Sequence, residues 1–134
     1  MSDWRLQLES LAAPAWLKEA AEAALADLQL PHPVALRLDY EAGGARLMVG
    51  EAGERHGAVG FWPEDQRGAQ LIVRLADYLQ AQLFPETRAA WGEARPHCPL
   101  HEHPAQAVEL HDEPWWVCPT DGREIAMVGR FPAD

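Results

Sequence analysis

The spacing of apolar residues predicts two amphipathic helices in the first two-thirds of the chain. In residues 14–30, apolar side chains recur at intervals of three and four, which places them on one helix face: Leu17, Ala21, Ala24 and Leu28. In residues 66–84, a stripe has the same kind of spacing: Ile72, Leu75, Leu79 and Leu83. Both segments end before a proline, and proline cannot continue a helix because it lacks the backbone N–H.

Between the two helices, the pattern changes to the two-residue period of β-strands. In residues 34–40, alternate side chains are apolar and face one way: Val34, Leu36, Leu38 and Tyr40. Two consecutive glycines then offer a tight turn, residues 45–50 resume the alternation, and residues 58–62 fit a shorter third strand. The predicted order is therefore α-β-β-β-α, an antiparallel sheet with helices packed on one face.

The last third of the chain predicts a smaller, separate β module. Residues 106–111 and 115–117 fit two strands joined by a turn, and residues 124–129 fit a third. A length of 134 residues suits one domain, or one domain with an appended module. We therefore expect an α+β fold in which an α+β domain spans residues 1–92 and a small β module spans residues 93–134.

Two tryptophans of this module are consecutive, and neighbouring side chains on a strand point to opposite faces of the sheet. One of Trp115 and Trp116 can thus seal the module against the rest of the chain. The other is then either covered by a further layer or exposed as an anchor for an interface.

The charge of the chain restricts its partners. The net charge is −10 at pH 7, and acidic residues outnumber basic ones in every third of the sequence. Nucleic acids bind to clustered Lys and Arg, so this composition disfavours a nucleic-acid partner. A protein partner or self-association is the expected alternative.

The sequence also predicts the compartment. No apolar run approaches the roughly 20 residues of a membrane span, and the N-terminus lacks a basic segment followed by an apolar stretch. We expect a cytoplasmic protein with no membrane partner, and the abundance of Arg, Ala and Pro suggests a bacterial genome rich in G and C.

Both cysteines of the chain lie in the C-terminal module, and each is followed by proline. Cys98 has His101 three positions later, and Cys118 has Asp121 three positions later. A turn of this kind brings side chains i and i+3 to the same point. Two such turns joined by a hairpin can close a tetrahedral zinc site, for which thiolate and imidazole are the preferred ligands.

On these residues, the stretch from Pro96 to Phe131 resembles the zinc-ribbon family, whose metal is held by rubredoxin-like knuckles. The resemblance implies one structural Zn²⁺ clamped by the two turns. The stretch departs from the family pattern at His101 and Asp121, which occupy positions where the family has cysteines.

This departure leaves the fourth ligand open between two residues. His103 is favoured because imidazole is the commoner zinc ligand, whereas Asp121 is favoured by its position in the knuckle. We expect His103, because Asp121 followed by glycine is also an ordinary turn signal. His97 and His111 are further candidates. The full set of predicted metal ligands is Cys98, His101, His103, Cys118 and Asp121.

Three alternatives compete with a structural zinc site. The cysteines can be small buried apolar residues or form a disulfide, although a cytoplasmic setting argues against the disulfide. The zinc can also be catalytic, with Glu102 as the general base beside an open coordination position. However, the sequence lacks the metalloprotease pattern HExxH and the pattern of zinc deaminases.

We therefore expect no catalytic residue and a metal-binding protein whose structural zinc supports a protein-interaction surface. A small zinc-dependent hydrolase that uses Glu102 is the alternative. A zinc ribbon associated with nucleic acid is the third possibility, and the acidic charge disfavours it.

Overall fold

A computed structural model describes residues 4–12, 15–29, 34–41, 44–50, 58–61, 68–83, 96–99 and 103–131. The helices are α1 (Trp4–Ser10), α2 (Ala15–Leu28) and α3 (Ala69–Leu83). The strands are β1 (Ala35–Glu41), β2 (Gly44–Gly50), β3 (Ala58–Phe61), β4 (Gln106–Leu110), β5 (Glu113–Val117) and β6 (Glu124–Met127). The prediction of an α+β fold is confirmed, and the C-terminal strands form a sheet of their own.

The first sheet has the strand order β1-β2-β3, and both pairings are antiparallel. The predicted alternation is visible where side chains are described, since Leu36 is half-buried and Leu47 is buried, whereas Ala35 and Arg37 are exposed.

Helix α1 was not predicted from the sequence. Its Gln7 side chain donates to the carbonyl of Val34 (2.7 Å) and accepts from the N–H of Leu36 (2.8 Å). The helix thereby satisfies backbone groups along β1 that an edge strand otherwise leaves unpaired.

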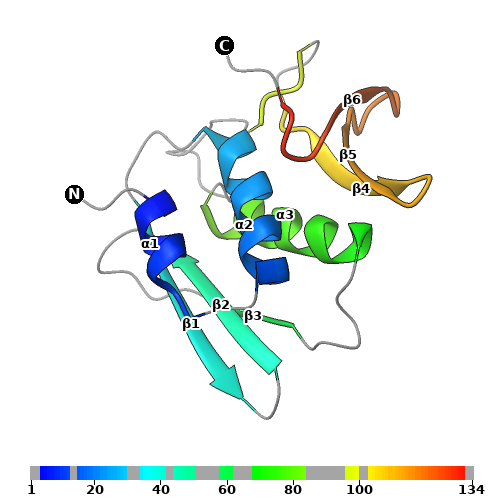
Figure 1. The fold of residues 1–134 in the computed structure, drawn as a ribbon. Coiled ribbons are helices and arrows are strands. Elements are labelled where there is room, and N and C mark those ends of the chain that lie inside the picture. Colours follow the sequence, from blue (N-terminus) through cyan, green and yellow to red (C-terminus); the bar gives the residue numbers. More distant parts are fainter. Residues whose placement is uncertain are drawn as a thin grey trace.

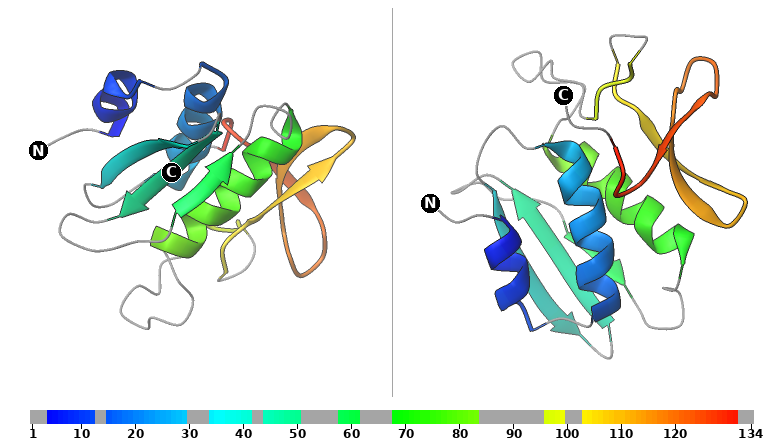
Figure 2. Two further views of the ribbon diagram at one scale, coloured as in Figure 1. Left: turned by 90° about the horizontal axis from the view of Figure 1, so that it is seen from below. Right: turned by 45° about the horizontal axis from the view of Figure 1, so that its top comes forward.

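The second sheet has the order β4-β5-β6, also antiparallel. Helices α2 and α3 lie between the two sheets (Figures 1 and 2). Helix α3 contacts β2 on one side and both β4 and β5 on the other. None of the helices in the described part of the chain is long and apolar enough to cross a membrane.

One hydrophobic cluster joins the helices to the second sheet. It contains Leu25 of α2 and Leu75 of α3 together with Ala107 and Trp116 of the second sheet. Trp116 is completely buried (0% exposed), whereas Trp115 on the opposite face is half-buried. The predicted boundary near residue 92 lies outside the described residues.

A buried carboxylate also connects α2 to the second sheet. Asp27 is 3% exposed and accepts hydrogen bonds from Trp116 Nε1 (2.7 Å), Gly129 N (2.5 Å) and Phe131 N (3.1 Å). Burial raises the pKa of this carboxyl above its ordinary value, and the three hydrogen bonds oppose the shift.

The close approach of α2 to the end of the second sheet depends on a glycine. Gly129 has a φ of +98°, and a Cβ placed there would lie 3.2 Å from Cβ of Ala23. A side chain at this position would therefore both strain the backbone and push the turn away from α2.

Candidate metal centre

The first cysteine is held by a short antiparallel turn that precedes β4. Cys98 N donates to the carbonyl of His103 (3.0 Å), and Ala105 N donates to the carbonyl of Pro96 (2.8 Å). The amide of Gln80, on α3, donates to the carbonyl of Ala105 (2.8 Å). This hydrogen bond links the turn to helix α3 and so helps to hold the positions of Cys98 and His103.

The second cysteine begins the turn between β5 and β6. Cys118 N donates to the carbonyl of Arg123 (2.8 Å), and Gly122 N donates back to the carbonyl of Cys118 (2.8 Å). Gly122 has a φ of +77°, a conformation that glycine adopts without steric cost. The Cys-Pro-Thr-Asp-Gly sequence thus folds into a tight loop whose ends are hydrogen-bonded to each other.

The two turns bring three possible metal ligands together. One ligand atom from each of Cys98, His103 and Cys118 lies within 4.8 Å of the other two. Both cysteines are 1% exposed and His103 is half-buried. The residues come from two separate turns, so the group exists only in the folded chain.

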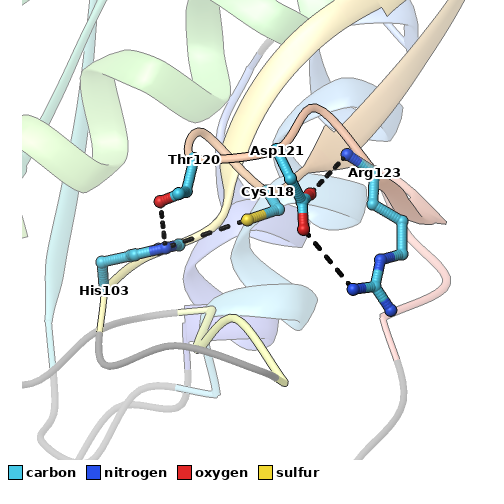
Figure 3. Close-up of polar contacts among 5 residues, drawn as sticks. All are labelled: His103, Cys118, Thr120, Asp121 and Arg123. Carbon is cyan, nitrogen blue, oxygen red and sulfur yellow. Dashed lines mark hydrogen bonds and ion pairs between the residues drawn. The ribbon is translucent and has the colours of Figure 1, made fainter.

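The imidazole of His103 is oriented for ligation through Nε2. Its Nδ1 lies 3.1 Å from the carbonyl oxygen of Pro104, and because a carbonyl only accepts, Nδ1 carries the proton. The other ring nitrogen, Nε2, faces Cys118 Sγ at 3.9 Å and the Thr120 hydroxyl at 3.1 Å (Figure 3). A carbonyl on the remote nitrogen is the usual support of a metal-binding histidine.

Asp121 is not part of this group of three. It is exposed, and its carboxylate accepts hydrogen bonds from the backbone N–H (2.9 Å) and the guanidinium (3.4 Å) of Arg123 (Figure 3). The backbone bond is the largest influence that lowers the pKa of this carboxyl, and the Cys118 side chain contributes as a further donor. In this arrangement Asp121 supports the Cys118 turn from outside.

The other predicted residues are placed as follows. His101 and Glu102 lie outside the described residues. His97 and His111 are exposed and do not belong to the group. The structure therefore brings together three of the five predicted ligands: His103, and not Asp121, has a ligand atom within 4.8 Å of both cysteine sulfurs.

Two residues that support the centre or the strand leading into it were not predicted from the sequence. Thr120 hydrogen-bonds the imidazole from the second turn, and nothing in the sequence separates it from an ordinary turn residue. Asp27 follows Ala24 by three residues and so belongs to the buried face of α2, a position that the stripe of apolar residues does not indicate.

No protein-family model, curated protein or solved structure matches this chain. The chemistry of the centre is therefore inferred from its own residues. Two thiols and an imidazole are ligands for zinc and similar transition metals, whereas Mg²⁺ and Ca²⁺ prefer oxygen.

Proposed function

We propose that this chain is a zinc-binding protein of the zinc-ribbon type, in which one structural Zn²⁺ fixes a small sheet that presents a surface to a protein partner. Cys98, His103 and Cys118 supply three of the ligands. The convergence of their ligand atoms within 4.8 Å carries the proposal.

The separations fit a tetrahedral zinc site. With Zn–S near 2.3 Å and Zn–N near 2.0 Å, tetrahedral angles place sulfur and nitrogen ligands about 3.5 Å apart. Cys118 Sγ and His103 Nε2 are 3.9 Å apart, so a movement of a few tenths of an ångström suffices. The Thr120 hydroxyl would then exchange its bond to Nε2 for another acceptor.

The position of the group favours a structural role. The ligands come from the turn before β4 and the turn after β5, and both cysteines are buried. Metal binding contributes folding free energy when the ligands come from separate turns of a small module. A zinc ion here would hold both ends of the hairpin in place.

The charge of the chain and the position of Trp115 favour a protein partner. The net charge of −10 disfavours nucleic acid, and the half-buried Trp115 lies on the face of the second sheet opposite to the completely buried Trp116.

The alternative is a zinc-dependent hydrolase with Glu102 as the base. A catalytic zinc keeps one position for water, whereas a structural zinc has four protein ligands. X-ray absorption on the zinc-loaded chain separates the two, because a fourth ligand from water and one from imidazole scatter differently. A shell of two sulfurs and two imidazoles supports the structural proposal.

The proposal is tested first by metal content. Protein purified without a polyhistidine tag should contain about one zinc per chain, and Cys118→Ser should contain far less. His111→Ala is the matched control, because this exposed histidine lies outside the group. A folded wild-type chain with less than about a tenth of an equivalent would refute the proposal, since a structural site should be filled.

A further inference from the structure

The face of the second sheet that points away from the helices has an apolar centre. Across the strands, Val108 pairs with Trp115 and Trp115 pairs with Met127. These three residues form one row on a single face, because paired residues of antiparallel strands share a side of the sheet. We call Val108, Trp115 and Met127 the outer row.

The alternation along the strands shows that the outer row faces away from the core. Ala107 and Trp116, on the other face, are buried and belong to the hydrophobic cluster shared with α2 and α3. The outer row is half-buried, and none of its residues is among the described side chains that pack against that cluster. Trp115 therefore contributes nothing to the described core.

Two exposed carboxylates flank the outer row. Glu113 lies two residues before Trp115 on β5, and so on the same face. Glu124 lies beyond a β-bulge between Trp116 and Val117, and it pairs with Val117, which lies two residues after Trp115 on β5. Each is thus about 7 Å along the strand from the level of the indole, on opposite sides of it.

The nearby cation does not offset these charges. Arg123 is exposed, but its guanidinium lies 3.4 Å from the carboxylate of Asp121. An apolar row between two acidic side chains is complementary to a segment that carries an apolar side chain beside Lys or Arg. A guanidinium has a further attraction to the face of an indole.

We infer that the outer row binds a basic, apolar segment of a partner protein, in which Arg or Lys side chains reach Glu113 and Glu124 while an apolar side chain covers Trp115. This inference rests on the proposed function and specifies its partner. A second copy of the chain fits less well, because a symmetric face-to-face contact would bring the acidic residues of both copies together.

The experiment uses the full zinc-loaded chain and a display library of random linear peptides. The selected peptides should be enriched in Arg and Lys next to an aromatic or aliphatic residue. The most enriched peptide is then synthesised, and its Kd is measured by fluorescence anisotropy for the wild type and three variants.

The variants separate the outer row from general charge effects. The double variant Glu113→Lys with Glu124→Lys should weaken binding about tenfold or more and reduce its dependence on salt. Trp115→Ala should weaken binding roughly thirtyfold or more, as for a residue that dominates an interface. Glu19→Lys, an exposed charge reversal on α2, is the control and should leave the Kd unchanged.

The outcomes bear separately on the inferred partner and on the proposed zinc site. A chain that holds one zinc but enriches no basic peptides, or enriches peptides insensitive to Glu113→Lys with Glu124→Lys, overturns the inferred partner and leaves the zinc proposal intact. A chain that binds no zinc but selects basic peptides with the expected sensitivity supports the partner and refutes the zinc site. Concentration-dependent dimerisation that Trp115→Ala abolishes would replace the basic partner by a second copy.

Discussion

The carboxylate of Asp27 accepts a hydrogen bond of 2.7 Å from the indole Nε1 of Trp116, a residue 89 positions further along the chain. Trp116 is on β5, two residues before Cys118. The same strand therefore carries one partner of the buried carboxylate and leads directly into one side of the candidate metal centre. Zinc binding and the packing of the second sheet on α2 should be coupled through this strand.

The position of Asp27 in its own helix offers it no support. Helix α2 ends at Leu28, and a negative charge in the last turn is disfavoured by the helix dipole. The three donors to Asp27 all come from the second sheet and the turn after it. The carboxylate is thus held by tertiary contacts alone, which makes it a sensitive probe of how the sheet packs.

Removing the carboxylate should destabilise the chain strongly. In Asp27→Ala, the buried N–H of Trp116 and the part-buried N–H groups of Gly129 and Phe131 lose their acceptor, and we expect a loss of roughly 2–4 kcal/mol in the free energy of unfolding. Urea unfolding followed by circular dichroism measures the loss. Glu22→Ala, an exposed change on the same helix, should shift the free energy by no more than about 0.5 kcal/mol.

Asp27 and Trp116 should also prove energetically coupled. Trp116→Phe removes the indole donor, and its cost should be smaller by about 1 kcal/mol or more when Asp27→Ala is already present. The same cycle with Trp115→Phe is the control, because that indole lies on the opposite face of the sheet. Additive effects in the Trp116 cycle would show that the hydrogen bond contributes nothing specific to stability.

The raised pKa of Asp27 predicts a particular pH dependence. The folded chain holds this proton more tightly than the unfolded chain, so the stability that depends on the bound proton is fully present below about pH 3.9 and is lost as the pH rises through the raised pKa. Zinc loss has the opposite sign, because acid protonates the ligands. Both the wild type and Asp27→Asn carry the same metal ligands, so the effect of zinc cancels in the difference between their free energies of unfolding. The advantage of the wild type should fall as the pH rises above about 4.

Unfolding curves of both proteins across this range, at saturating zinc, provide the measurement. If the difference between wild type and Asp27→Asn instead grows with pH, the three hydrogen bonds outweigh burial and the direction of the pKa shift is wrong.

The elements set by local periodicity could be predicted from the sequence, and those set by distant contacts could not. The stripe of α2 and the alternation of β1 both appear in the structure, because burial follows the period of the backbone itself. Helix α1 has only seven residues, and its Gln7 bonds reach 27 and 29 positions along the chain. So short a helix is marginal on its own and depends on such contacts.

In the candidate site, too, the features set by local spacing could be predicted and those set by distant contacts could not. The two Cys-Pro turns and the nearby histidines mark the region, because the spacing of metal ligands within a turn is local. The choice between His103 and Asp121 beside the cysteines depends on how two distant turns meet, and in the structure the carboxylate is turned toward Arg123. The role of Asp27 is likewise invisible in the sequence, since its partners are 89 to 104 positions away.

Removal of zinc should loosen the second sheet before the first. With a chelator, amide hydrogen exchange should accelerate in β4, β5 and β6, and in the part of α2 that contacts them through Asp27. The central residues of β1 and β2 should keep their protection, because their pairing does not involve the metal turns. Unchanged protection in β4–β6 would argue against a structural metal.

The identity of the ligands can be resolved by paired substitutions and competition with a chromophoric chelator. His103→Ala should weaken zinc affinity about tenfold or more, since its Nε2 lies 3.9 Å from Cys118 Sγ. Asp121→Asn should change the affinity little, because an amide oxygen can still accept from Arg123 N and the wild-type carboxylate lies outside the group. His101→Ala tests the remaining knuckle position: a loss equal to that of His103→Ala identifies His101 as the fourth ligand. If Asp121→Asn proves as damaging as His103→Ala, the carboxylate must turn from Arg123 to the metal, and the arrangement of the second turn changes on binding.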